Sequence, residues 1–282
     1  MRQSRASLIG AYVVLGILAL LFLVPFYVMI RNAFSTSTWI SSPTWHLLPN
    51  SWGTGNLSRL LANTNVGLVQ ALGVSAVIAV TQTVLTLVIA AMAGYALAKL
   101  APAGRGPMRR ASSAVLGLTL VTLMVPSAVT FVPSFVMVAG LGWVSSFRGL
   151  IVPLLFSAFA VFLYRQYFTG FPVELEEAAR LDGAGYWRTF WRVVMPNSIG
   201  ITGAIGTITF IGAWNAFLWP LLIGQDRAYR TVQVALSTFM TSQGVDVPEL
   251  FTGGLVAILP VVLVFVVLQR FLVEGVERSG IG

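Results

Sequence analysis

Apolar residues occur along this chain in six long runs, separated by polar or charged segments. A membrane-spanning helix needs about 20 predominantly apolar residues, and the runs are of that order. Prolines predict irregular helices, with a bend near Pro25 in the first run and interruptions at Pro126 and Pro133 in the third. The pattern predicts an all-α integral membrane protein with six transmembrane helices, at residues 8–30, 66–98, 114–138, 149–168, 198–223 and 251–268.

The composition agrees with this prediction, because 57% of the residues are hydrophobic and only 9% are charged. A soluble domain carries about 25% charged residues. The sequence contains no cysteine, which excludes disulfides and thiolate metal sites. The first apolar run is too long for a signal-peptide core and lacks a clear cleavage site, so we interpret it as a span.

The net charge of +8 is compatible with a nucleic-acid partner, but the distribution of the cations favours membrane topology instead. With the N-terminus inside, twelve of the seventeen Lys and Arg residues fall on the cytoplasmic side, as the positive-inside rule requires. Both termini are then expected in the cytoplasm. The polar loops 31–65 and 224–250 lie outside, and His46 in the first of them is interpreted as an ordinary surface residue. The twelve cytoplasmic cations are Arg2, Arg5, Lys99, Arg105, Arg109, Arg110, Arg165, Arg180, Arg188, Arg192, Arg270 and Arg278.

The segment 171–196 is the longest charge-dense stretch and holds four of the nine acidic residues. Pro172 suits the start of a helix, and the glutamates that follow it favour the positive end of the helix dipole. Gly183 and Gly185 can end that helix. The segment therefore predicts a short helix, a glycine turn and a second helix on the cytoplasmic side.

The second helix, residues 186–195, is predicted to be amphipathic. Its aromatic and aliphatic residues recur at helical spacing and would form one apolar stripe. On physical grounds alone, the segment could be a solvated connector whose second helix lies among the lipid headgroups. The stripe consists of Trp187, Phe190, Trp191 and Val194.

The order of residues in this segment resembles the EAA signature of ABC importer permeases. Glu177, Ala178 and Ala179 are followed at the family's spacing by Gly183, and then by an aliphatic residue and Met195-Pro196. Val193 and Met195 replace the usual Ile and Leu. The resemblance continues over essentially the whole chain, at residues 94–100, 124–135, 174–185, 214–222 and 268–271.

This pattern is most similar to the second membrane subunit of maltose-type carbohydrate importers. The chain departs from it in two places: the Asn-Ser that usually opens the second span is absent near Leu72-Gly73, and the tail lacks the usual terminal Lys-Gly. The resemblance implies a type I ABC importer permease fold in a bacterial-type inner membrane. We divide the chain into an N-terminal span with its outer loop (1–65), a core of five spans (66–272) and a cytoplasmic tail (273–282).

The resemblance also implies the partners: a second homologous permease subunit, two cytoplasmic ATP-binding subunits that carry the ATP and Mg²⁺, and an extracytoplasmic solute-binding protein. This chain itself would bind no cofactor. The EAA helix would dock in a cleft of the ATPase, and we expect aspartate at Gly183 or Ala179 to uncouple ATP hydrolysis from uptake. The residues implied for coupling are Glu177, Ala178, Ala179, Arg180, Asp182, Gly183 and Pro196.

The fifth span offers candidates for solute contact, because an amide beside aromatic rings can hydrogen-bond to and stack on a sugar. The same side chains could instead pack the subunit interface or the membrane surface. These candidates are Trp214, Asn215, Phe217 and Trp219.

The sequence shows no Walker A motif, metal-protease motif or nucleophile elbow, so no catalytic or metal-binding residue is predicted. No acidic residue lies in the middle of a span, and proton-coupled carriers usually need one. Energy is therefore expected to come from a partner. The alternatives are a permease of the same superfamily for a peptide, an amino acid or glycerol phosphate, and a stand-alone secondary carrier. A membrane-embedded enzyme would need a polar catalytic cluster.

Overall fold

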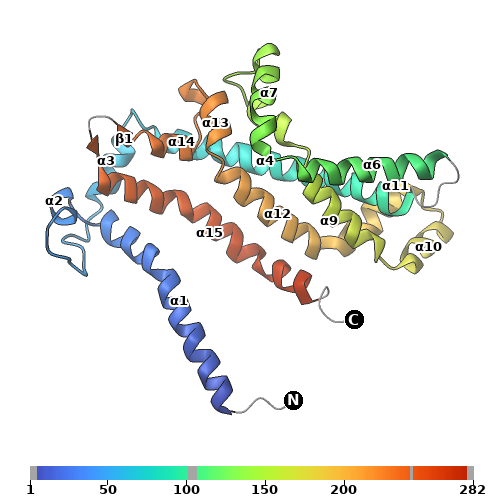
Figure 1. Cartoon of the computed structure of the whole chain (residues 1–282), viewed down its shortest axis with the longest axis horizontal. Helices are drawn as coiled ribbons and strands as arrows, with labels where there is room; N and C mark the ends of the chain where they lie inside the picture. Colours follow the sequence, from blue (N-terminus) through green and yellow to red (C-terminus); the bar gives the residue numbers. More distant parts are fainter. Residues whose placement is uncertain (1–4, 101–106, 242–243, 278–282) are drawn as a thin grey trace. The chain divides into compact units, whose positions relative to one another are not determined.

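The structure, a computed structural model, describes residues 5–100, 107–241 and 244–277. The described chain is helical apart from one antiparallel hairpin, β1 (Met240–Thr241) with β2 (Gly244–Val245), in which Met240 pairs with Val245. Figure 1 shows the helices labelled along the chain. The chain forms two compact units: unit 1 comprises Met1–Gln70 and Val232–Leu259, and unit 2 comprises Ala71–Thr231 and Pro260–Gly282.

Three cations that support the predicted topology, Arg2, Arg105 and Arg278, lie outside the described residues, as does the end of the predicted tail. The cytoplasmic location of both termini stays a prediction, as does the division of the chain at residues 65 and 272.

Unit 1 contains the first predicted span and the outer loop that follows it. The span is a continuous helix, and Pro25 lies inside it without ending it. The elements of unit 1 are α1 (Arg5–Ala33), α2 (Ser37–Ile40), α3 (Gly55–Ala62), the start of α4 (Leu68–Tyr95), α14 (Val232–Ser237), the hairpin and the first part of α15 (Val247–Glu277).

Unit 2 contains the rest of α4 and α15 and all of the segments between residues 96 and 231. Within it, α9 packs against α6, η1 and α12. Its other elements are η1 (Ala96–Leu100), α6 (Pro107–Met124), α7 (Ser127–Gly140), α8 (Phe147–Ile151), η2 (Val152–Leu154), α9 (Ala158–Thr169), α10 (Val173–Leu181), α11 (Tyr186–Thr189), η3 (Phe190–Val194), η4 (Pro196–Ser198), α12 (Ile199–Trp214), α13 (Leu218–Ile223) and η5 (Arg227–Tyr229).

Three described helices are individually long and apolar enough to cross a membrane: Leu8–Ala33, Leu68–Lys99 and Val247–Phe271. Three further pairs of helices satisfy the same criteria when each bent pair is counted as one span, which gives up to six spans. The first two bent pairs match the third and fourth predicted spans. The last pair, Tyr186–Val194 with Pro196–Trp214, overlaps the fifth predicted span but begins within the predicted cytoplasmic segment. The predicted all-helical class is therefore confirmed, and the six predicted spans correspond to the upper count, in which each bent pair is one span.

The third span shows the largest departure from a straight helix. It bends by 102° between residues 124 and 127, where Pro126 is the residue that precedes α7. The residue before a proline is disfavoured in the α conformation, which explains why α6 ends there. The predicted interruption at Pro126 is confirmed. Pro133, in contrast, lies inside α7, so the predicted interruption there is wrong.

The fifth predicted span does not continue to residue 223 as one helix. Helix α12 ends at Trp214, residues 215–217 are irregular, and α13 begins at Leu218. Pro220 has no amide hydrogen, and its ring would clash with the carbonyl of residue 216 in a continuous helix. The proline therefore favours a break that hydropathy alone does not reveal.

The predicted helix 186–195 is not a regular α-helix, because α11 passes into the π-helical turn η3. In this turn the Met195 amide donates a hydrogen bond of 2.9 Å to the Phe190 carbonyl. Phe190 and Val194 are buried, whereas Trp187 and Trp191 are exposed. The Trp187 and Trp191 rings nevertheless lie beside the Phe190 ring, with centroids 6.4 and 5.0 Å from it, so the predicted stripe is buried in part and exposed in part.

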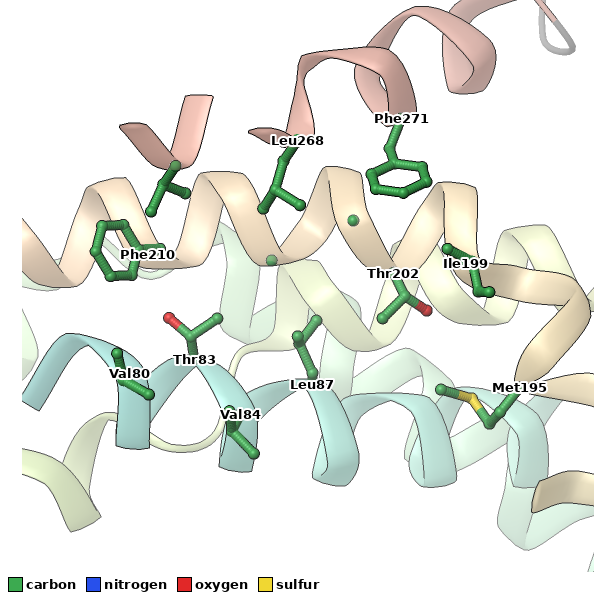
Figure 2. Close-up of a pocket in the computed structure, with 13 residues that line it drawn as sticks. Val80, Thr83, Val84, Leu87, Met195, Ile199, Thr202, Phe210, Leu268 and Phe271 are labelled. Carbon is green, nitrogen blue, oxygen red and sulfur yellow. The ribbon is translucent and has the colours of Figure 1, made fainter. Parts of the chain in front are cut away.

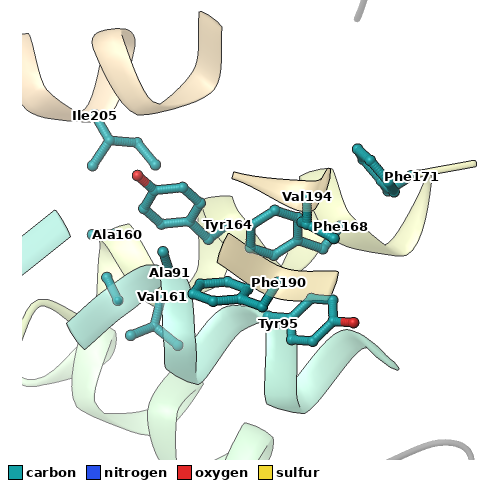
Figure 3. Packing of buried hydrophobic residues seen from close by; sticks show 11 residues of the cluster. Ala91, Tyr95, Ala160, Val161, Tyr164, Phe168, Phe171, Phe190, Val194 and Ile205 are labelled. Atoms are coloured by element: carbon teal, nitrogen blue, oxygen red, sulfur yellow. The ribbon is translucent and has the colours of Figure 1, made fainter. Parts of the chain in front are cut away.

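A cluster of buried aromatic and small residues forms part of the core of unit 2. Figure 3 shows Tyr164, Phe168 and Phe190 packed together with Tyr95 between the helices that carry them. The Tyr164 and Phe168 rings are stacked with centroids 5.5 Å apart. The small residues Ala91 and Ala160 allow α4 and α9 to approach each other closely.

Gly94 marks the tightest part of that approach. A Cβ atom added there would lie 2.6 Å from Tyr164 Cβ and 2.8 Å from the Arg165 amide nitrogen. We expect Gly94→Ala to destabilise the protein by about 1–3 kcal/mol, the usual cost of overpacking. Gly73→Ala, on the same helix with no atom within 4 Å of its Cβ position, is the matched control. The thermal unfolding midpoint of the purified transporter should be lower for Gly94→Ala only, and equal midpoints for the two variants would contradict this packing.

Candidate coupling site and solute path

Helix α10 has well-defined ends, which fix its position in the charge-dense segment. Glu174 and Glu176 lie in its first turn and Arg180 in its last, as the helix dipole favours. At its C-terminus, the Ala184 amide bonds to the Ala179 carbonyl at 2.9 Å and the Gly183 amide to the Arg180 carbonyl at 3.0 Å. This pair of bonds is a Schellman motif, and Gly183 supplies its left-handed residue with φ of +79°.

The inward side of α10 carries a buried carboxylate. Glu176 is only 2% exposed, and its Oε2 accepts a hydrogen bond of 2.9 Å from the Tyr95 hydroxyl. The Lys99 ammonium lies 3.0 Å from Glu176 Oε1 and donates a hydrogen bond of 2.8 Å to the Phe171 carbonyl. We call Tyr95, Lys99, Phe171 and Glu176 the Glu176 network. It fastens α10 to the end of α4 and to η1.

The opposite side of α10 is open. Glu177, Ala178 and Asp182 are exposed, and Leu181 is 89% exposed. The Gly183 Cβ position has no atom within 4 Å, so the turn leaves room for a partner. We call the exposed residues Glu177, Ala178, Leu181, Asp182 and Gly183 the α10 outer face. Small side chains flanked by acidic groups suit close docking against a complementary protein surface.

The residues predicted for coupling therefore do not form one surface. Ala179 is buried on the inward side, so an aspartate there would disturb packing before it disturbed docking. Arg180 has its guanidinium carbon 5.1 Å from the centroid of the Tyr186 ring and lies 3.9 Å from Glu176. Pro196 is exposed and begins η4, beyond η3.

The Glu176 network was missed from the sequence. Lys99 was counted only as a cation for topology, and Glu176 only as one of several acidic residues. The available signal was helical spacing, because Glu176 lies three residues before Ala179 and four before Arg180. Which glutamate of the pair 176–177 points inward depends on the helix start, which the sequence does not fix to one residue.

The four solute-path candidates also divide into two groups. Trp214 and Trp219 are buried, the first stacked on Phe210 at 5.8 Å between centroids and the second donating a hydrogen bond of 3.1 Å to the Gly149 carbonyl. Asn215 and Phe217 lie in the irregular stretch between α12 and α13, and both are exposed. The two tryptophans hold this stretch in place, and the other two side chains are accessible.

A cleft of about 330 Å³ lies between α4, the break that precedes α9, and α12. Irregular backbone within a span is tolerated where it lines a cavity, and Phe156 and Ser157 of the irregular stretch line this one. The exposed rings of Phe156 and Phe159 border the cleft. Its polar side chains are Gln82, Thr86, Ser157 and Thr209, and its lining includes no charged residue.

Three of the four polar groups in the cleft are engaged with backbone. The Thr86 hydroxyl donates to the Leu155 carbonyl at 3.0 Å, Ser157 Oγ accepts from the Ala160 amide, and the Thr209 hydroxyl donates to the Ile205 carbonyl. The amide of Gln82 is therefore the side chain best able to turn toward a solute. Together with the aromatic rings, it suits a neutral polyhydroxylated molecule.

A larger cavity in unit 2, of about 560 Å³, has a different character. Figure 2 shows aliphatic and aromatic side chains from α4, α12 and α15 around it, including Leu87, Leu268 and Phe271. The hydroxyl of Thr202, one of its few polar groups, accepts a hydrogen bond from Tyr164 at 3.0 Å. This cavity offers little to a polar solute.

Comparisons with known proteins agree with this architecture. The family described as "Binding-protein-dependent transport system inner membrane component" matches residues 90–278. The chain belongs to this family. Its members are non-catalytic, multi-pass permeases of the inner membrane that serve ABC importers with a binding protein and an ATPase. In the described part of the permease, no group of three or more His, Cys, Asp or Glu residues is placed to hold a metal ion.

Two characterised relatives indicate the range of solutes. The permease is 33% identical over 207 residues to the arabinooligosaccharides transport system permease protein AraQ of Bacillus subtilis, covering 73% of this chain and 71% of that one. It is also 33% identical over 286 residues to the sn-glycerol-3-phosphate transport system permease protein UgpE of Yersinia enterocolitica, covering 99% of both. The names of these two relatives therefore cover both an oligosaccharide and a phosphate ester as the transported solute.

The fold also matches a solved structure. A chain of a bacterial ABC transporter involved in the import of the acidic polysaccharide alginate superposes with a TM-score of 0.80. The match covers 96% of this permease and 99% of that chain at 22% sequence identity. It confirms the predicted ABC importer permease fold.

Proposed function

We propose that the permease couples ATP hydrolysis to the import of a neutral carbohydrate. It works with a second homologous permease subunit, two cytoplasmic ATP-hydrolysing subunits and an extracytoplasmic solute-binding protein. The α10 outer face docks in a cleft of one ATPase subunit. Closure of the nucleotide-bound ATPase pair moves α10, and the Glu176 network passes this movement to α4, which alternates access to the solute path. Of the two outer loops, 31–65 and 224–250, the second carries the charges that suit contact with the binding protein.

The observation that supports coupling most strongly is the contrast between the two sides of α10. Its outer face is exposed and combines small and acidic residues with the apolar Leu181, while its inner side is fixed by a buried ion pair. A buried pair resists displacement, because separating it leaves an uncompensated charge in an apolar environment. A helix built in this way can transmit a push from a partner instead of deforming locally.

The proposal of a neutral solute is supported by the cleft lined by Gln82, Phe156 and Phe159. A phosphate ester is recognised by arginine, lysine or a metal ion, and the cleft lining includes none of these. Glycerol 3-phosphate stays the second candidate, because the UgpE relatives align over nearly the whole chain. Asn215 and Phe217 extend the proposed solute path from the cleft to the end of α12.

Uptake into proteoliposomes that hold the complete transporter, with ATP inside and binding protein outside, separates the two solutes. We expect labelled neutral oligosaccharides to accumulate and sn-glycerol 3-phosphate not to compete. Accumulation of glycerol phosphate instead would contradict the choice of solute but not the coupling role.

The variant Gln82→Leu tests the cleft directly. Loss of one hydrogen bond to a neutral solute should raise the KM for uptake about 3- to 10-fold with little change in the ATP hydrolysed per solute. Gln70→Leu, an exposed glutamine on the same helix that does not line the cleft, is the control. An equal KM for both variants would remove Gln82 from the solute path.

A further inference from the structure

A groove of about 270 Å³ lies along the C-terminal half of α1 in unit 1. One wall is a single face of the helix, because its residues are spaced by three and four positions. The other wall comes from the loop that follows α1. The lining residues are Leu23, Phe26, Tyr27, Ile30 and Arg31 from the helix, and Leu48, Pro49 and Trp52 from the loop.

Arg31 gives this apolar groove a charged end. Arg31 is only 4% exposed, and its Nη1 donates a hydrogen bond of 2.8 Å to Asn32 Oδ1. The guanidinium carbon lies 4.5 Å from the centroid of a Trp45 ring. Its Nε is buried and has no hydrogen-bond partner among the described residues.

Among the described residues, no carboxylate forms an ion pair with Arg31. Within the described part of the chain, the ion pairs are Arg59–Glu249, Lys99–Glu176 and Arg180–Glu176, and none includes Arg31. A buried cation without an anion is strongly unfavourable, and a neighbouring aromatic ring offsets only part of that cost. The groove therefore has a position where an anionic group from another molecule would be stabilised.

We propose that this groove binds a membrane phospholipid, with its phosphate at Arg31 and one acyl chain along Leu23, Phe26 and Ile30. The groove continues the apolar surface of a 26-residue candidate span, so lipid reaches it from the bilayer. Arginine is well suited to phosphate, because its guanidinium can donate two parallel hydrogen bonds. The net-anionic headgroup of phosphatidylglycerol fits better than a zwitterionic one.

The loop that forms the second wall supports a lipid partner over a protein partner. Residues 32–58 contain no Asp, Glu, Lys or Arg, although a protein-docking loop usually uses such groups to set orientation. Trp45, Leu47, Leu48 and Trp52 are all exposed by 64–69%. Tryptophans at the end of a span are typical of the membrane–water interface.

The groove can be closed to phosphate without touching a buried residue. Leu48→Glu places a carboxylate in the groove lining, and Leu47→Glu places one on the adjacent exposed residue that does not line it. The complete transporter, reconstituted in nanodiscs of mixed phosphatidylglycerol and phosphatidylcholine, is extracted into detergent, and its retained lipids are counted by native mass spectrometry. Arg31→Gln, which keeps a donor for Asn32, is the second variant.

We expect the wild type and Leu47→Glu to retain phosphatidylglycerol. Leu48→Glu and Arg31→Gln should retain about tenfold less of it, a loss of one lipid per copy of this permease. Equal retention by Leu47→Glu and Leu48→Glu would overturn the proposal. Displacement of the lipid by inorganic phosphate or sn-glycerol 3-phosphate would assign Arg31 to a soluble anion instead. Protection of Leu48→Cys from labelling in a complex that retains no lipid would assign the groove to a partner subunit.

Discussion

Gly183→Asp is expected to abolish ATP-driven uptake, by about 100-fold or more, while the permease still inserts and ATP hydrolysis by the complex continues. Two effects combine at this position. A residue with a side chain at φ of +79° costs about 1–2 kcal/mol, although Asp tolerates this region better than most. The larger effect is a new charge beside Asp182 on the α10 outer face, where a docked ATPase would have to bury it without a partner.

A matched variant separates docking from folding. Gly185 lies in the same turn, is exposed, has no atom within 4 Å of its Cβ position and has an ordinary φ of −72°. Gly185→Asp should therefore keep most of the uptake. Solute uptake and ATPase activity are measured on the same proteoliposomes. Full uptake by Gly183→Asp, or equal loss by both variants, would count against the docking role.

Ala179→Asp is expected to behave differently from what the EAA pattern suggests. Because Ala179 is buried on the inward side of α10, a carboxylate there should lower the amount of folded permease in the membrane. The sequence resemblance grouped it with Gly183 as a docking residue. The structure assigns the two residues to opposite sides of the segment.

The second large effect is expected for the ion pair of the Glu176 network. Glu176→Gln leaves the Lys99 ammonium buried without its counter-charge, and removal of one partner of a buried pair typically costs about 3–5 kcal/mol. The lysine side chain is 15% exposed, so this value is an upper estimate. We expect a clear fall in the thermal unfolding midpoint and in uptake. Glu174→Gln, an exposed residue in the first turn of the same helix, should change neither.

The double variant Glu176→Gln with Lys99→Met separates the effect of the ion pair on protein stability from its effect on the coupling of ATP hydrolysis to transport. Removing both charges should recover much of the lost stability, because no uncompensated buried charge remains. If the pair transmits the movement of α10 to α4, the double variant should still hydrolyse more ATP per imported solute than the wild type. Recovery of both stability and this ratio would limit the pair to a structural role.

The sequence predicted the features of the fold that depend on long apolar runs. Each predicted span coincides with or overlaps an apolar helix or a bent pair of helices. The break at Pro126 was found because proline acts on its immediate neighbours. The break after Trp214 was missed because the residues around Pro220 are as apolar as a helix would be, so hydropathy did not register it. The π-helical turn at residues 190–194 was missed because the spacing of its apolar residues is also that of an ordinary helix.

The candidate site was predictable only in outline. The spacing from Glu177 to Pro196 located the segment and the turn at Gly183. It did not show that Glu176, and not Glu177, is the buried glutamate, because its partners Tyr95 and Lys99 lie about 80 residues earlier in the chain. The polar cleft was missed for a related reason. Gln82, Phe156 and Thr209 come from three separate segments, and no local pattern brings them together.

The central claim is that the α10 outer face contacts the ATPase, and cross-linking tests it most directly. The permease contains no cysteine, so Leu181→Cys, at a residue that is 89% exposed, carries a single thiol for a photoactivatable cross-linker. In native membranes that contain the complete transporter, we predict a covalent adduct between the permease and an ATP-hydrolysing subunit. The same reagent at Asn50→Cys, in the outer loop, should give no such adduct. Absence of the adduct from position 181, or its formation from position 50, would contradict the account.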